Sequence, residues 1–213
     1  MPDTPRSEEQ PLAGTTLGAL ANVHWDSPLQ KSYDPELLDK YTSQASMYEA
    51  GIRQGGVTMR PEPGRKPLTV GDGEWYGVGG SKNPRTGERE PERSVDVNPN
   101  VNGMQFNVNN ALGHILRAEG YNLDRKAGRT SNGKVWPAGF AGGWLETPEE
   151  GPNAGRPQAV MDYSSVFRGR RGRDAAIRSA YARGERAVFD AKNIDDIDVR
   201  SAIRELETRK AQR

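Results

Sequence analysis

The strongest constraint on this chain is its shortage of large apolar side chains from which to build a hydrophobic core. Leucine, isoleucine, valine and phenylalanine make up 35 of its 213 residues, about 16%, where disorder becomes a realistic expectation below roughly 20%. The 25 glycines and 15 prolines add many backbone breaks. Disorder usually also needs a high net charge, however, and this chain has a formal charge of +1, four tryptophans and seven tyrosines. We therefore expect a small packed core with long irregular arms.

The distribution of these residues predicts an α+β fold, with a small mixed core, several amphipathic helices, a short antiparallel sheet and long irregular arms. Residues 1–32 contain four prolines and few apolar anchors, so we expect an extended N-terminal arm. Residues 33–166 should form the small α+β core, with loops rich in glycine and proline. Residues 167–213 should form a basic helical C-terminal tail.

The clearest helical pattern lies in residues 34–54. Asp34 is a good N-cap, and Pro35 suits the first helical position. Apolar side chains recur at helical spacing and form one stripe, which can serve as core or as a face for docking a partner. We predict a partner-docking role for four of its members, Leu37, Tyr41, Tyr48 and Ile52.

Three further helices are expected, over residues 107–119, about 174–191 and about 196–210. Gly120 should end the first of them, and residues 121–123 should then enter a strand. The last helix has only a narrow apolar stripe, so we expect it to need a partner.

Short strands are expected at residues 74–79, 94–97 and 158–166. The first two should pair with each other across the long, charged loop 80–92. The segment 134–145 is rich in aromatic residues and glycine, and its proline and glycines oppose a helix. We expect a turn-rich apolar segment that docks on partners through Trp136, Phe140 and Trp144.

Arginine and glycine alternate at the start of the C-terminal tail. Residues 165–213 hold 13 basic and 8 acidic side chains, a net charge of +5. Arginine on a flexible backbone contacts phosphates without sequence preference and stacks on bases, and it also pairs with carboxylates of a neighbouring subunit. A solvated basic linker is the third interpretation. The candidate contact residues for an acidic partner or nucleic acid are Arg168, Arg170, Arg171 and Arg173.

Few residues are suited to catalysis or to metal binding. The chain has no cysteine and only two histidines, 90 positions apart, which argues against a multi-histidine metal site and leaves a carboxylate site open. We predict no cofactor and no metal. Asp72 and Glu74 flank a glycine and could form a pair of carboxylates near His114, whereas a strand-entry turn explains them equally well. The aspartates at 195, 196 and 198 lack the glycine and distal glutamate of a calcium loop, so helix capping is preferred.

One stretch of the chain resembles a known family. Asn98-Pro99 leads to Asn107-Val108-Asn109-Asn110, and the following helix ends in Arg117-Ala118-Glu119-Gly120-Tyr121-Asn122-Leu123. This stretch resembles papain-fold toxin-like domains, which occur in bacterial effectors and fused to phage minor capsid proteins. That family has an Asn-Cys pair opening the helix. Here the nucleophilic cysteine is missing, the nearest positions are Asn107 and Asn110, and no histidine follows His114. Because an amide cannot be the nucleophile, the resemblance implies an inactive copy kept for structure.

These features predict a non-enzymatic structural component of a large assembly, specifically a bacteriophage virion protein of the minor capsid, head–tail connector or tail. It would dock by its arms and amphipathic helices, be oligomeric in the assembly, and bind other virion proteins, with packaged DNA as a further partner of the basic tail. Two alternatives stay open. One is a small enzyme or effector domain with a carboxylate-based site in residues 72–114, and the other is a nucleic-acid-binding module centred on Arg168–Arg173.

We expect neither export nor membrane insertion. No apolar run approaches the roughly 18 residues that a membrane span needs. The first twenty residues lack the basic start and the apolar stretch of a signal peptide. The expected location is the virion, after synthesis in the host cytoplasm.

Overall fold

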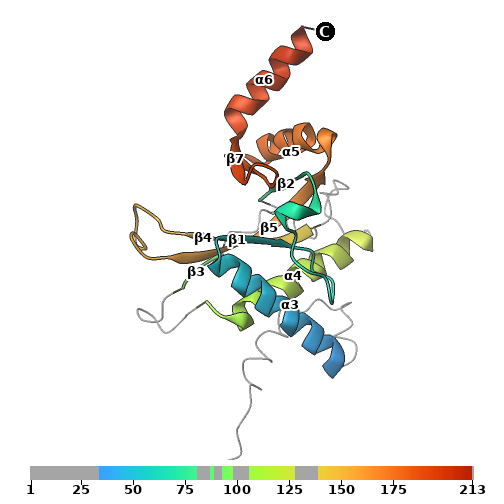
Figure 1. Ribbon diagram of the computed structural model, residues 1–213, viewed down its shortest axis with the longest axis vertical. Helices are drawn as coiled ribbons and strands as arrows, with labels where there is room; N and C mark the ends of the chain where they lie inside the picture. Colours follow the sequence, from blue (N-terminus) through green and yellow to red (C-terminus); the bar gives the residue numbers. More distant parts are fainter. Residues whose placement is uncertain (1–33, 81–86, 89–92, 98–105, 128–138, 213) are drawn as a thin grey trace, which may run out of the picture.

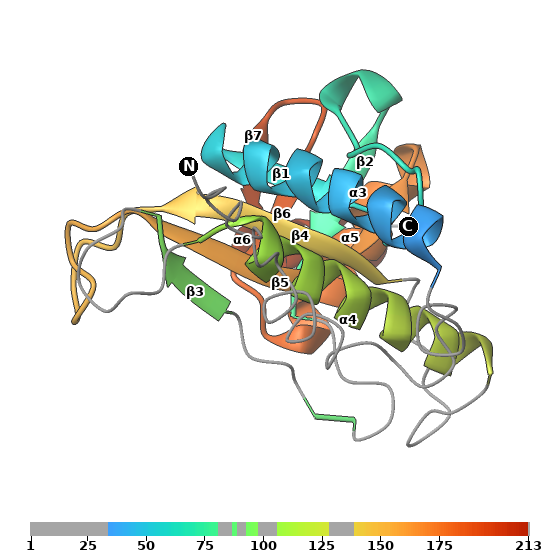
Figure 2. The same ribbon diagram turned by 90° about the horizontal axis from the view of Figure 1, so that it is seen from below.

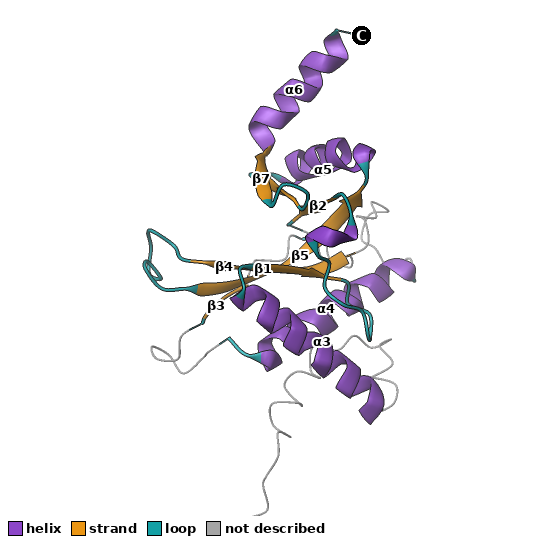
Figure 3. Ribbon diagram, viewed as in Figure 1, coloured by secondary structure: helices purple, strands orange, loops and turns teal. Residues whose placement is uncertain are grey.

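The computed structural model describes residues 34–80, 87–88, 93–97, 106–127 and 139–212. The predicted arm at 1–32, Trp136 and residues 98–105 of the papain-fold resemblance lie outside the described residues. The fold belongs to the α+β class, as predicted. Figures 1 and 3 show its elements, which are α3 (Pro35–Arg53), β1 (Gly56–Met59), η1 (Val70–Asp72), β2 (Trp75–Val78), β3 (Arg93–Asp96), α4 (Val108–Lys126), β4 (Gly139–Glu146), β5 (Gln158–Arg168), α5 (Arg170–Arg183), β6 (Ala187–Asp190), β7 (Asp195–Asp198) and α6 (Val199–Ala211).

The strands form one antiparallel sheet around β5. In the described residues the order is β1-β4-β5-β2-β6-β7, and β3 also pairs with β5. Strand β4 lies along one edge of β5, while β3 pairs with residues 158–161 and β2 with residues 165–168 of the other edge. The predicted pairing of 74–79 with 94–97 is therefore wrong, because the long β5 pairs with both segments.

The helices cover successive parts of one twisted sheet face. Side chains alternate between the two faces of a strand, so Met161, Tyr163 and Phe167 of β5 share a face. Met161 and Tyr163 pack in the core beneath α3 and α4, whereas Phe167 packs beneath α5. Figures 1 and 2 show α3 and α4 on one side of the strands and α5 on the other. The twist of β5 accounts for this arrangement. At one end of the strand this face is directed toward α3 and α4, and at the other end it is directed toward α5.

The two packing regions differ in the size of their side chains. Beneath α3 and α4 the fully buried residues are large, including Tyr41, Tyr48, Phe106, Ile115 and Leu116. Around α5 and α6 the clusters are smaller. Apart from Tyr76 they contain only alanine and aliphatic side chains, namely Ala176, Ala180, Ala202, Val78, Val188, Val199, Ile177, Ile203 and Leu206. The chain thus has one substantial core and a smaller extension of it.

Helix α3 begins where the sequence predicts. The Asp34 side chain accepts hydrogen bonds from the backbone N–H groups of Glu36 and Leu37. Helix α4, in contrast, runs through Gly120 to Lys126, so both the predicted stop and the predicted strand at 121–123 are wrong. Gly120 and Tyr121 are buried, and the burial of this face outweighs the cost of about 1 kcal/mol that glycine imposes on a helix.

Strand β4 occupies residues that we expected to be turn-rich. The prediction for 134–145 is wrong from Gly139 onward, because these residues pair with β5 along the whole strand. The glycines let a helix approach closely. A Cβ atom at Gly143 would lie 2.5 Å from Ile52 Cδ1 and 2.7 Å from Tyr48 Oη, so α3 can pack here only on a residue without a side chain.

The C-terminal region contains two strands that the sequence analysis missed. Helix α5 runs from Arg170 to Arg183 and is followed by Gly184, which is left-handed at φ 76°. Strand β6 then pairs with β2, and β7 pairs with β6. Helix α6 packs on α5 through the cluster that contains Ile177 and Leu206. Within the described segments, no helix is both long and apolar enough to cross a membrane.

Candidate functional site

The stripe on α3 forms part of the chain's own core. Tyr41, Tyr48 and Ile52 are completely buried, and the half-buried Leu37 packs against the same cluster. These side chains are occupied by contacts within the chain, which leaves them little surface for the docking role predicted for them. The apolar stripe indicated burial correctly, but the sequence could not show that α4 and β4 supply the partner surface.

The aromatic residues of β4 are likewise largely covered. Phe140 is buried and Trp144 is half-buried, and Trp136 lies outside the described residues. The neighbouring Leu145 is exposed. In this structure Phe140 offers little surface for the docking role predicted for it, while Trp144 retains part of its ring surface.

Two tyrosines of α3 make buried polar contacts. The Tyr41 hydroxyl donates to the Glu119 carboxylate on α4, and the Tyr48 hydroxyl donates to the Gly142 carbonyl on β4. Burial raises the pKa of both hydroxyl groups, so they remain protonated donors. These contacts fix α3 in place rather than leaving reactive groups exposed.

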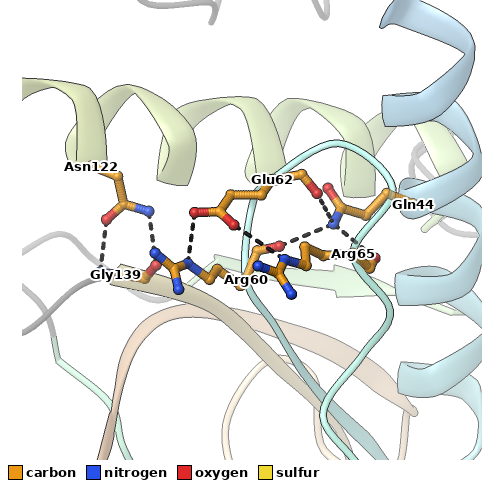
Figure 4. Close-up of polar contacts among 6 residues, drawn as sticks. All are labelled: Gln44, Arg60, Glu62, Arg65, Asn122 and Gly139. Atoms are coloured by element: carbon orange, nitrogen blue, oxygen red, sulfur yellow. Dashed lines mark hydrogen bonds and ion pairs between the residues drawn. The ribbon is translucent and has the colours of Figure 1, made fainter.

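A single amide of α3 holds the loop that follows β1. Gln44 Nε2 donates to the backbone carbonyls of Arg60, Glu62 and Arg65, at 3.0, 2.9 and 3.1 Å. The Glu62 carboxylate lies 2.8 Å from Arg60 Nε and 3.3 Å from Arg65 Nε. Figure 4 shows this arrangement, with the carbonyls converging on Gln44 and the two arginines on either side of Glu62.

On the α4 side of the same view, one side chain fixes the start of β4. The amide of Asn122 donates to the Gly139 carbonyl at 2.9 Å and accepts from the Gly139 N–H at 2.8 Å. Both hydrogen bonds go to the backbone of Gly139, as those from a neighbouring strand would. It serves to position the backbone.

His114 is a buried structural residue. Its ring stacks on Tyr163 with centroids 4.3 Å apart, and its Nε2 lies 2.9 Å from the Asp162 carbonyl. The carboxylates considered with it have other partners. Asp72 accepts from the Thr69 N–H and hydroxyl, and Glu74 accepts from the Tyr76 hydroxyl. These contacts give the three candidate residues of an enzymatic site separate structural roles.

A buried carboxylate lies at a part of β5 that, among the described residues, has a strand neighbour on one edge only. Residues 162–164 fall between the segments paired with β3 and β2. The Asp162 carboxylate accepts hydrogen bonds from the backbone N–H groups of Gly80 and Tyr163, at 2.9 and 2.6 Å. A Cβ atom at Gly79 would lie 2.3 Å from Asp162 Oδ2. Glycine at 79 therefore allows the end of β2 to approach this carboxylate.

Arg183 completes the polar contacts at this point. Its guanidinium donates to the Gly79 carbonyl at 2.9 Å and to the Ser165 hydroxyl at 2.8 Å. Burial lowers its pKa to about 10, while the charges of Glu185 and Asp162 oppose that shift. The arginine remains charged at neutral pH, and its bonds tie the end of α5 to β2 and β5.

The described residues contain no group of three or more histidine, aspartate and glutamate side chains that could hold a metal ion. The C-terminal aspartates have structural contacts. Asp198 is the N-cap of α6, with its side chain accepting from the Ser201 N–H at 2.8 Å. Asp195 accepts from the Asp196 N–H at 2.8 Å.

The predicted arginine cluster lies at the junction of β5 and α5. Arg168, Arg170 and Arg171 are exposed, and Arg173 is half-buried. Burial raises the pKa of Tyr76, and the charge of Arg173 opposes that shift, which places Arg173 toward β2. Ion pairs within the described part of the chain involve none of the four arginines.

The glycines between the arginines have defined structural roles. Gly169 adopts φ 70° just before α5, a left-handed conformation that favours glycine. A Cβ atom at Gly172 would lie 3.0 Å from the backbone carbonyl carbon of Phe167. These residues form a tight strand-to-helix turn and the first turn of α5, in the segment for which a solvated basic linker was one of the three interpretations.

Two residues of the same surface were missed from the sequence. Arg178 and Tyr181 are exposed on α5, and Tyr181 retains 60% of its accessible area. They follow Arg171 by seven and ten positions, a spacing that places all three on one side of a helix. A helix start at 170 rather than 174 would have revealed this pattern. We call the exposed Arg168, Arg170, Arg171 and Arg178 the arginine surface.

Comparisons with known proteins identify no relative. A scan against protein-family models finds no matching family, and searches of curated proteins and of solved structures find no significant match.

Proposed function

We propose that this chain is a non-enzymatic component of a larger assembly, best fitted by a bacteriophage virion, and that it binds an anionic partner through the arginine surface. The observation that carries the proposal is the exposure of four arginines without an ion pair in the described residues. Arginine is suited to phosphates and carboxylates because its planar fork donates two parallel hydrogen bonds.

The position of these arginines supports a binding role. Arg170 and Arg171 occupy the first turn of α5, where the helix dipole is positive and a cation is unfavourable by about 0.3–1 kcal/mol. The first turn also contains no acidic residue. A locally unfavourable choice of residue is typical of functional sites, and an anionic partner would neutralise both the side chains and the helix terminus.

The virion assignment is supported by the character of the chain and by its resemblance to a phage-associated family. Residues 98–123 resemble the papain-fold toxin-like domains that are fused to minor capsid proteins. A helix does begin at Val108, after the Asn107 N-cap, and the positions nearest to the family's missing cysteine are Asn107 and Asn110. A chain without that nucleophile would retain the domain for binding and assembly.

The enzymatic alternative has less support. His114, Asp72 and Glu74 each have structural partners, and the polar groups around Asp162 and Arg183 bind backbone atoms. These contacts favour a role in positioning the chain.

The test is binding to heparin, a generic polyanion, with two variants that remove equal charge. One variant changes Arg168, Arg170, Arg171 and Arg178 to alanine. The matched control changes four exposed cations of α6 to alanine, namely Arg200, Arg204, Arg209 and Lys210. We expect the first variant to elute at much lower salt than the wild type and the control to elute close to it. Equal shifts in both variants, or no shift in the first, would contradict the proposal.

A further inference from the structure

We infer that the anionic partner is single-stranded nucleic acid, with phosphates bound by the arginines of α5 and a base stacked on Tyr181. This inference rests on the proposed function and specifies its partner. It follows from the combination of arginines and one exposed aromatic ring on the outer side of a single helix.

The spacing along α5 suits a short stretch of strand. Arg171, Arg178 and Tyr181 lie on the outer side of the helix, and all are exposed. At a rise of 1.5 Å per residue, the ten residues from Arg171 to Tyr181 span about 15 Å. That length corresponds to about four nucleotides of a stacked strand at about 3.4 Å per nucleotide.

The surroundings of Tyr181 leave its ring open to a ligand. Tyr181 retains 60% of its accessible area, and its hydroxyl makes no hydrogen bond with a described residue. Two small residues of the same helix, Ala175 and Ala182, are also exposed. Asp174 is the acidic residue of this helix, and its spacing places it on the same side as Arg171 and Arg178. Two arginines against one carboxylate leave this side with a positive net charge.

The exposed aromatic ring favours a single strand over the other anionic partners. An acidic protein would pair with the arginines but would gain little from Tyr181. In a duplex the bases are stacked inside, so a tyrosine on a convex helix surface cannot stack on them. Unpaired bases present a free π-face, and stacking on an aromatic side chain is tolerant of sequence. Arginine contributes both charge and stacking to the same strand.

The experiment measures fluorescence anisotropy of a labelled single-stranded DNA oligonucleotide, a duplex of the same sequence and a single-stranded RNA of that sequence. The wild type is compared with Tyr181→Ala, Tyr181→Phe and the four-arginine variant. Circular dichroism verifies that each variant is folded. Unlabelled polyglutamate serves as a competitor with charge but without bases.

We expect the wild type to bind the single strands with a salt dependence near −2 in log K against log salt, for about three phosphate contacts. Tyr181→Ala should weaken binding to single strands by about 5- to 150-fold, while Tyr181→Phe should keep it. Binding to the duplex should be weaker and unaffected by Tyr181→Ala. The ratio of DNA to RNA affinity then identifies which single strand is preferred.

The outcomes separate the inference from the proposed function. If Tyr181→Ala binds single strands as well as the wild type while the four-arginine variant does not, the stacking inference is overturned and the anionic surface stands. Effective displacement by polyglutamate, or tighter binding of the duplex, overturns the choice of single-stranded nucleic acid. Wild-type binding by the four-arginine variant overturns the proposed function itself.

Discussion

The regions under α3–α4 and around α5–α6 share one sheet but stabilise it in different ways. Under α3 and α4, large side chains are completely buried, and Tyr41, Tyr48 and Gln44 make hydrogen bonds across elements. Around α5 and α6 the buried side chains are smaller, and arginines without described ion pairs occupy the surface. On the function proposed above, the first region supplies stability and the second supplies the binding surface.

The largest expected effect compares the same substitution in the two regions. Tyr48→Ala removes a fully buried ring and the donor to the Gly142 carbonyl, so we expect it to lower the free energy of unfolding by about 3–5 kcal/mol. Tyr181→Ala removes an exposed ring and should change that free energy by less than about 0.5 kcal/mol. Urea denaturation of both variants measures the contrast. Similar losses of unfolding free energy in the two variants would contradict this difference between the two regions.

A smaller effect is expected from Gln44→Ala. The change removes the donor shared by three backbone carbonyls, and leaving buried groups unsatisfied costs roughly 1–3 kcal/mol. Urea denaturation should show this loss, and limited proteolysis should cut more readily near residues 60–65. Gln54→Ala, at an exposed position just after α3, is the control. If both substitutions behave alike, the hydrogen bonds of Gln44 do not stabilise the loop.

The next prediction has the opposite sign. Changing Arg170 and Arg171 to alanine removes cations from the N-terminal turn of α5 and should raise the free energy of unfolding by about 0.3–1 kcal/mol per residue. Arg209→Ala, in the last turn of α6 beside Glu205, should lower it slightly, because a cation there is favourable. Thermal denaturation distinguishes the two directions. A loss of stability at Arg170 and Arg171 would mean that they serve the fold.

The smallest effect concerns the cap of α6 at acid pH. Hydrogen bonds with Ser201 hold the pKa of Asp198 below its usual range. The cap therefore contributes stability above the usual carboxyl pKa of about 3.9, and this contribution is lost as the pH falls through the lower pKa of the folded state. An asparagine side chain at this position would cap the helix comparably without titrating.

We expect the melting temperature of the wild type to fall relative to that of Asp198→Asn as the pH drops below about 4. Circular dichroism melts over this range provide the measurement. If the melting temperatures of the two proteins differ by the same amount at every pH, protonation of Asp198 does not affect the stability of the fold.

The sequence predicted those features that depend on local patterns. The Asp34 cap, the apolar stripe of α3 and the strand at 158–166 follow from spacing and composition, and the α+β class follows from their mixture. The arginine cluster was also recognised, because its composition is unusual regardless of structure. Apart from the fold class, each of these features can be read within a window of fewer than twenty residues.

The remaining features depend on contacts that are distant in sequence. Gly143 and Gly120 weaken their segments locally, and only the packing of α3 on β4 and the burial of α4 explain their positions. Strand β6 was missed because its partner β2 lies more than a hundred residues earlier. Tyr181 was missed because its exposure depends on the direction in which α5 faces.

The pairing pattern of the sheet also affects how the chain can fold as it is synthesised. The ladders formed by β1, β2 and β3 pair them with strands that begin at Gly139 or later. Pairing between segments that are far apart in sequence is slow because the loop must close first. Until the β4–β5 hairpin leaves the ribosome, the first three strands have no ladder partner among the described residues. A nascent chain stopped before Gly139 should therefore expose unpaired strand segments to aggregation and proteolysis.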